Sequence, residues 1–196
     1  MEDVDDRDHE PAGHPGAPKL SFRAATRATK GTKRRTESRD GVLRRADVGD
    51  LEAIYRIEAV CFKEHRFRRE HIRWILTNEH AVTVVEDGTP GLLGAVMLLF
   101  EGKVGRVLSI AVIPEARRRG LGTELMREAE RIAAEHHCDL VRLEVSTANA
   151  GALEFYRKLG YEVDGFLPGY YSWGEDAHGM HKRLAVTPTA KAPANA

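Results

Sequence analysis

The sequence has little cysteine, no long hydrophobic run and no excess of charge of either sign. Its 196 residues include only two cysteines, Cys61 and Cys138, too few for a disulfide framework, and no paired Cys/His spacing typical of zinc sites. With 30 basic and 30 acidic residues the formal net charge is 0, so overall charge favours no particular partner. The longest apolar run, residues 92–100, is too short to span a bilayer, which argues against a membrane protein.

The two ends of the chain lack helical or strand periodicity. The first 40 residues carry an acidic segment, MEDVDDRDHE, and then a basic one, KGTKRRTESR. We therefore expect a disordered tail over residues 1–40, one folded domain over 41–185 and a second disordered tail over 186–196. The acidic start resembles neither a signal peptide nor a transit peptide, which favours a cytoplasmic protein. The basic segment has no interleaved aromatic residues, so nucleic acid is not an expected partner.

Hydrophobic periodicity and turn residues predict the order β-α-α-β-β-β-α-β-α-β-β, an α/β domain. The hydrophobic fraction of 42% supports one ordinary core. The predicted strands cover residues 41–46, 81–87, 92–100, 106–113, 139–146, 161–168 and 177–184. The predicted helices cover residues 51–62, 68–78, 120–136 and 150–159.

Residues 117–122 read RRRGLG and lie between a predicted strand and a predicted helix. Glycines at a helix start expose backbone N–H groups, the helix dipole adds partial positive charge, and arginines supply fork-shaped donors. The loop therefore fits a phosphate or pyrophosphate, although a solvated basic turn would explain the same residues. It is not a Walker A loop, because no lysine precedes Thr123, nor a dinucleotide fingerprint, because Leu125 replaces the third glycine.

Three motifs together resemble the GNAT acetyltransferases. Arg117-x-x-Gly120-x-Gly122 resembles the family's pyrophosphate loop, and LEVSTANAGALEFYRKLGYE resembles its second signature, a strand followed by a short helix. GYYSWGEDAHGMHK resembles the substrate hairpin of one subgroup, the ribosomal-protein-alanine N-acetyltransferases and the N-alpha-acetyltransferases. The resemblance covers residues 42–184 and implies a single α/β (α+β) domain. Its sheet would be mixed, mostly antiparallel and splayed at the acetyl-CoA site, with helices on both faces.

The resemblance implies acetyl-CoA as cosubstrate. Amides of the strand would pair with the pantetheine arm and steady the thioester oxygen, the loop would hold the pyrophosphate, and an asparagine would bind near the pantetheine. The residues expected at acetyl-CoA are Ile110, Ala111, Val112, Arg117, Arg118, Arg119, Gly120, Leu121, Gly122, Thr123 and Asn149.

By the same resemblance Glu144 is the general base and Tyr156 the acid that protonates the departing thiolate. Strand alternation places Glu144 on one face with Arg142, so a solvated glutamate paired with Arg142 or a cross-strand lysine is the alternative. For Tyr156 the alternative is core packing.

The resemblance also assigns substrate-binding residues. Tyr170 and Tyr171 of the hairpin would line the peptide site, although hairpin packing would explain at least one of them. In the loop CFKEHRFRR, Phe62 would wall the pocket or complete the apolar face of its helix, and Glu64 loosely matches the glutamate of the family's LPEN sequence. Lys63 replaces the proline of that sequence. No third ligand accompanies the closing histidines, so no metal site is expected.

These observations predict an acetyl-CoA-dependent N-acetyltransferase acting on the N-terminal α-amine of a protein or peptide, with a ribosomal protein as one candidate acceptor. Two alternatives stay open. The first is a GNAT enzyme that acetylates a lysine side chain or a small amine, and the second is a non-catalytic acyl-CoA-binding regulator. The oligomeric state is not predicted.

Overall fold

The computed structural model describes residues 42–185, and the two predicted tails lie outside the described residues. Within this range the strands and helices follow the predicted order. The strands are β1 (Leu43–Arg45), β2 (Ala81–Glu86), β3 (Gly94–Glu101), β4 (Val104–Val112), β5 (Leu140–Ser146), β6 (Glu162–Leu167) and β7 (Ala177–Arg183). The helices are α1 (Leu51–Phe62), α2 (Arg69–Thr77), α3 (Leu121–Glu135) and α4 (Ala150–Lys158), with short 3-10 turns at Val48–Asp50, Lys63–His65 and Pro114–Ala116.

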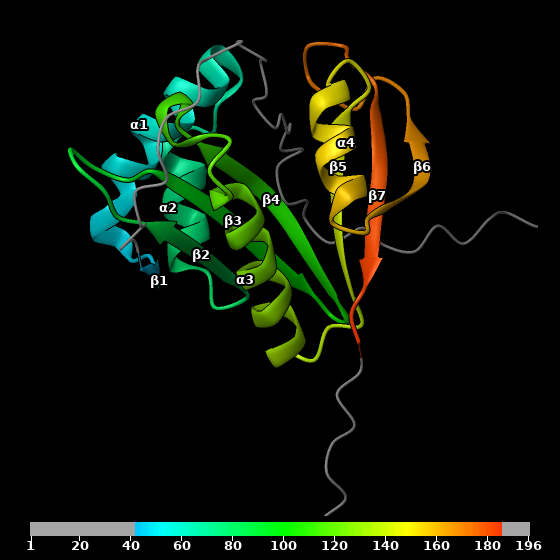
Figure 1. Ribbon diagram of the computed structural model, residues 1–196, viewed down its shortest axis with the longest axis horizontal. Helices are drawn as coiled ribbons and strands as arrows, with labels where there is room; N and C mark the ends of the chain where they lie inside the picture. Colours follow the sequence, from blue (N-terminus) through cyan, green and yellow to red (C-terminus); the bar gives the residue numbers. More distant parts are fainter. Residues whose placement is uncertain (1–41, 186–196) are drawn as a thin grey trace, which may run out of the picture.

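The strands form one sheet in the order β1-β2-β3-β4-β5-β7-β6. All neighbours are antiparallel except β4 and β5, which pair only from Val104 to Arg106. Because β4 continues to Val112 and β5 to Ser146, the two strands diverge beyond Arg106 and leave a V between them (Figure 1). The predicted mixed, splayed sheet is confirmed.

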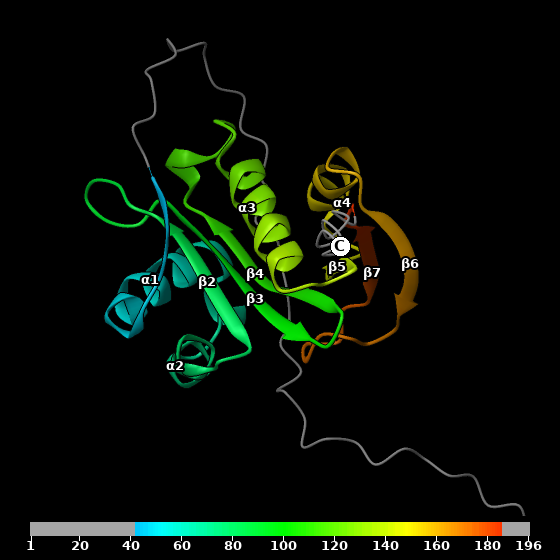
Figure 2. The same ribbon diagram turned by 90° about the horizontal axis from the view of Figure 1, so that it is seen from below.

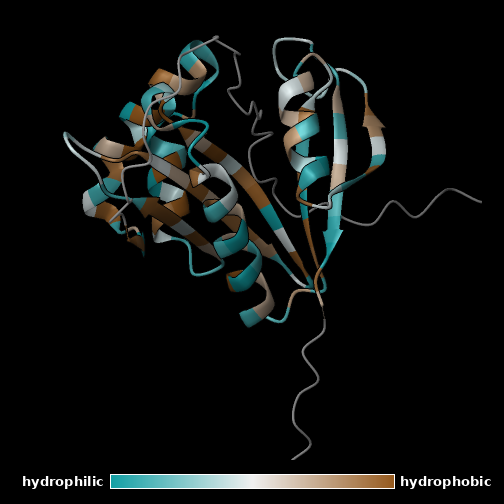
Figure 3. Cartoon of the chain, in the orientation of Figure 1, coloured by the Kyte–Doolittle hydropathy of each residue, from teal (hydrophilic) through white to brown (hydrophobic). Residues whose placement is uncertain are grey.

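Helices cover both faces of the sheet, as predicted (Figure 2). On one face Leu125 of α3 and Leu153 of α4 share a core cluster with Leu143 of β5. On the other face Ile54 of α1 and Ile72 of α2 belong to a second cluster. Figure 3 shows why both faces are covered: the central strands β2 to β4 are hydrophobic over most of their length, so they need apolar partners on each side.

Strand β4 contains one residue more than the stretch of β3 beside it. Leu98 lies opposite Val107 and Met97 opposite Ser109, which leaves Leu108 unpaired in a β-bulge. As a result Leu108 and Ser109 both face helix α1, where Leu108 joins the core cluster and Ser109 hydrogen-bonds to a glutamate. Bulges often re-aim side chains beside active sites, and this one lies in the part of β4 that lines the V, just beyond Arg106.

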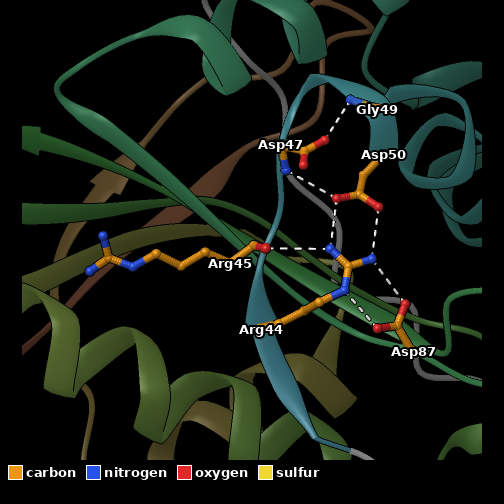
Figure 4. Close-up of polar contacts among 6 residues, drawn as sticks. All are labelled: Arg44, Arg45, Asp47, Gly49, Asp50 and Asp87. Atoms are coloured by element: carbon orange, nitrogen blue, oxygen red, sulfur yellow. Dashed lines mark hydrogen bonds and ion pairs between the residues drawn. The ribbon is translucent and has the colours of Figure 1, made fainter.

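Arg44 connects β1 to the start of α1 and the end of β2 (Figure 4). Its guanidinium donates to both oxygens of Asp50 at 2.8 Å and to the Asp87 carboxylate at 2.6 and 2.9 Å. Asp50 also accepts from the Asp47 N–H, and Asp47 caps the 3-10 turn by accepting from the Gly49 N–H. The hydrogen bonds from Arg44 lower the pKa of Asp50 below its ordinary value.

Candidate active site

Helix α3 begins at the open end of the V without a side-chain cap. Gly120, its N-cap, has φ of 91°, a left-handed conformation that favours glycine. A Cβ at Gly122 would lie 3.4 Å from Cζ of Phe155, so the start of α3 lies close to α4. The first N–H groups of a helix have no acceptor within the helix, and the dipole adds positive charge. This loop therefore fits the phosphate site that the sequence predicts.

The three arginines of the loop do not point the same way. Arg118 and Arg119 are exposed, whereas Arg117 is half-buried. The Arg117 Nε donates to the carbonyl oxygen of Val112 at 2.8 Å, and its Nη2 lies 3.7 Å from Sγ of Cys61. Arg117 thus ties the loop to the end of β4, and its contact with a pyrophosphate stays a prediction.

The edge of β4 that faces the V has no strand beside it beyond Arg106 within residues 42–185. Ile110 and Ala111 are buried and Val112 is half-buried along this stretch. An open strand edge offers backbone N–H and C=O groups to an extended ligand. Asn149 lies near the mouth of the V and caps α4, since its side-chain oxygen accepts from the Ala152 N–H at 3.1 Å.

Glu144 lies on β5, two residues beyond the last pair with β4. It is buried, with 6% of its surface exposed, so it is not solvated as the alternative expected, whereas the expected pairing with Arg142 is present. Its Oε2 lies 3.1 Å from Nη2 and 3.2 Å from Nε of Arg106, and its Oε1 lies 3.9 Å from Nε of Arg142. The sequence indicated Arg142 as a partner but not Arg106. The signal that could have indicated Arg106 is its charge inside the mostly apolar strand β4.

The two adjacent tyrosines of the β6–β7 loop have different roles in the packing. The Tyr170 hydroxyl accepts from Nη2 of Arg106 at 2.8 Å, so this ring lies beside Glu144. Burial, followed by the charge of Glu144, raises the pKa of Tyr170 to about 12. Tyr171 is buried and stacks on Trp173, with ring centroids 4.7 Å apart. The structure brings Tyr170 to the predicted site and places Tyr171 in the core, as the packing alternative indicated.

Tyr156 of α4 is fully buried between Phe155 and Tyr161. Its hydroxyl has no hydrogen-bond partner among the described residues. Burial raises the pKa of Tyr156 far above its ordinary value, so the phenol stays protonated. A buried, protonated hydroxyl without a partner fits a donor to a bound group, and core packing accounts for the ring.

The other two predicted substrate residues are Phe62, the last residue of α1, and Glu64, in the loop between α1 and α2. Phe62 is buried in the core cluster under α1, so packing accounts for it. The Glu64 side chain is 73% exposed and its carboxylate lies 3.6 Å from Nε2 of His65. The His65 ring lies against the Trp173 ring, with centroids 3.8 Å apart. This contact, which the sequence did not indicate, joins the α1–α2 loop to the β6–β7 loop.

The sequence also did not indicate Glu58, a buried glutamate of α1. Glu58 accepts from the Ser109 hydroxyl at 2.5 Å and from the Phe67 N–H at 3.3 Å. Burial raises the pKa of Glu58 to about 7. These hydrogen bonds connect α1 to the bulged part of β4 and to the end of the α1–α2 loop.

Residues 42–185 contain no cluster of three or more side chains suited to a metal ion. None of the helices in this part of the chain is long and apolar enough to cross a membrane.

Comparison with known proteins identifies the family. The profile described as Acetyltransferase (GNAT) family matches residues 51–161, more than half of the chain. The chain belongs to the GNAT acetyltransferase family. GNAT acetyltransferases use acetyl-CoA, so this GNAT domain is an acyltransferase with acetyl-CoA as its cosubstrate, as the sequence predicted.

Relatives and solved structures agree with this assignment. The GNAT domain is 31% identical over 148 residues to the N-terminal acetyltransferase A complex catalytic subunit NAA10 of Arabidopsis thaliana, covering 72% of this chain and 77% of the relative. It is 32% identical over 155 residues to an N-alpha-acetyltransferase of Sulfurisphaera tokodaii, covering 70% and 90%. The fold matches the ribosomal-protein-S18-alanine N-acetyltransferase of Escherichia coli with a TM-score of 0.69, 21% identity, and coverage of 77% and 98%.

Proposed function

We propose that this GNAT enzyme transfers acetyl from acetyl-CoA to the N-terminal α-amine of a protein or peptide, with Glu144 as general base. The observation that carries the proposal is the position of Glu144, a buried carboxylate next to the point where β4 and β5 diverge. Tyr170 of the β6–β7 loop lies beside Glu144, because Arg106 hydrogen-bonds to both side chains. The relatives named as N-terminal and N-alpha-acetyltransferases support the same class of acceptor.

The donor side of the V supplies the binding groups. Acetyl-CoA brings its acetyl group as a thioester. The start of α3 and the exposed Arg118 and Arg119 bind the pyrophosphate through N–H groups and positive charge. The open edge of β4 around Ile110 pairs with the pantetheine arm, and an amide there stabilises the charge that develops on the thioester oxygen.

On the acceptor side Glu144 removes a proton from the ammonium, directly or through one water. A peptide α-amine has an ordinary pKa of about 7.7–8.0, against about 10.4 for lysine, so a single carboxylate suffices near neutral pH. The β6–β7 and α1–α2 loops, joined by His65 and Trp173, enclose the chain end. Such an enclosure is less needed for a small amine.

Tyr156 donates its proton to the departing thiolate. Its buried hydroxyl has no hydrogen-bond partner among the described residues, so it is available to a group bound in the V. The free thiols of Cys61 and Cys138 fit a reducing compartment, which supports the cytoplasm as the location.

The test is thiol release from acetyl-CoA with a panel of short peptides that begin with alanine, serine or methionine, each free and N-blocked. We expect release with free peptides and none with their blocked forms. Release with blocked peptides that contain lysine would favour a lysine acetyltransferase. No release with any amine would favour an acyl-CoA-binding regulator.

A further inference from the structure

Arg106 lies at the point where the sheet opens. It is the last residue of β4 that pairs with β5, opposite Arg142. Its side chain is 25% exposed, which is low for an arginine. No motif in the sequence assigns it a role.

One guanidinium contacts three separate segments. Its Nε and Nη2 bind the Glu144 carboxylate of β5 at 3.2 and 3.1 Å. The same Nη2 donates to the Tyr170 hydroxyl of the β6–β7 loop at 2.8 Å, and Nη1 lies 3.8 Å from Oε1 of Glu101 at the end of β3. The planar fork of arginine allows these contacts at once, whereas the ammonium of a lysine would make fewer of them.

Arg106 is the main cation at Glu144. Arg142 lies farther, at 3.9 Å, is 40% exposed and also contacts Asp164 at 3.4 Å. An ion pair is strongest where solvent is excluded, so the buried pair dominates over the exposed one. Within residues 42–185, the charged and titratable groups near Glu144 on the elements packed around it include Arg106, Glu101, Arg142, Tyr170, Tyr171, His181 and Asp164.

We propose that Arg106 is a positioning residue for acetyl transfer, which keeps Glu144 ionised and holds Tyr170 beside it. This inference rests on the proposed function. A buried carboxylate without a cation binds a proton more readily, and a protonated Glu144 cannot accept one from the ammonium.

The test compares Arg106→Met, which keeps the apolar stem, with Arg106→Lys and with Arg142→Met. Values of kcat/KM for a free peptide are measured from pH 5.5 to 9.5. In Arg106→Met we expect the acidic limb of the curve of kcat/KM against pH to move to higher pH by about one pH unit or more. This is the usual effect of losing an opposite charge at this distance. The loss of kcat/KM is then larger at pH 5.5 than at pH 9, where the carboxylate is ionised in both proteins. Arg106→Lys recovers part of the shift, and Arg142→Met shifts the limb less.

A second readout does not depend on activity. Glutamate labelled at Cδ with ¹³C reports the titration of Glu144 by NMR, with Glu144→Gln to assign its signal. We expect its midpoint to rise in Arg106→Met, which must retain the native circular dichroism spectrum. A parallel loss at every pH with an unmoved NMR midpoint would overturn the proposal. A moved midpoint in a protein that acetylates no peptide would overturn the proposed function instead.

Discussion

The ring of His65 lies tilted against the ring of Trp173, with centroids 3.8 Å apart and an interplanar angle of 34°. This pair joins two loops that are more than 100 residues apart in the sequence. Because both loops border the proposed acceptor side, the contact bears on how the peptide is held.

Replacing Trp173 by alanine removes this contact and the stack on Tyr171. Aromatic pairs contribute about 0.5–1.5 kcal/mol, so we expect the KM for the peptide to rise about 2- to 10-fold. The KM for acetyl-CoA should not change. Trp74→Ala is the control, since Trp74 is 40% exposed on α2. Equal effects of the two variants on peptide KM would show that the loop contact is unimportant.

Gly120→Ala tests the start of α3. Alanine at φ of 91° is strained, so we expect a loss of stability of about 1–2 kcal/mol and weaker binding of acetyl-CoA. Gly102→Ala is a matched control in the β3–β4 turn, where φ is 61° and a Cβ would meet open space. It should cost similar stability in urea unfolding yet leave acetyl-CoA binding intact in calorimetry. If both variants lost acetyl-CoA binding equally, Gly120 would have no specific part in binding the pyrophosphate.

Much of the fold was predictable because each element has its own local signal. The apolar spacing of α3 and the glycines of its first turn both follow from neighbouring residues. The contact between Arg106 and Glu144 does not, since these residues are 38 positions apart and meet through the pairing of β4 with β5. Periodicity placed Glu144 on a strand face but did not show that the face is buried.

The raised pKa of Glu58 makes stability depend on pH. Between the ordinary value of 4.5 and about 7, the unfolded chain releases the proton and the folded protein keeps it. The free energy of unfolding therefore falls as pH rises through this window, by at most about 3 kcal/mol, since one pKa unit corresponds to about 1.4 kcal/mol. Glu58→Gln stays neutral and should be more stable than the wild type at pH 8 but not at pH 4. Urea unfolding at the two pH values checks this, and a constant difference between the proteins would contradict it.

The effect of Asp50 on the pH dependence of stability is opposite to that of Glu58. The pKa of Asp50 is lowered by the Arg44 hydrogen bonds, so its contribution is present above about 3.8 and is lost as pH falls through the lowered folded value. Asp50→Asn should cost about 1–2 kcal/mol at pH 7, and the cost should shrink in acid. Asp87→Asn, whose side chain is 58% exposed, should cost less than about 1 kcal/mol. Thermal unfolding measures the stability of both variants. A larger loss in Asp87→Asn would show that Asp87, and not Asp50, is the more important partner of Arg44.

The most direct test of the proposed acceptor uses one peptide with a free N-terminus and an internal lysine. After incubation with the enzyme and acetyl-CoA, fragmentation mass spectrometry locates the added acetyl group. We expect it on the α-amine, with Glu144→Gln slowing its appearance by about a hundredfold or more. Acetyl on the lysine with the α-amine left free would contradict the account.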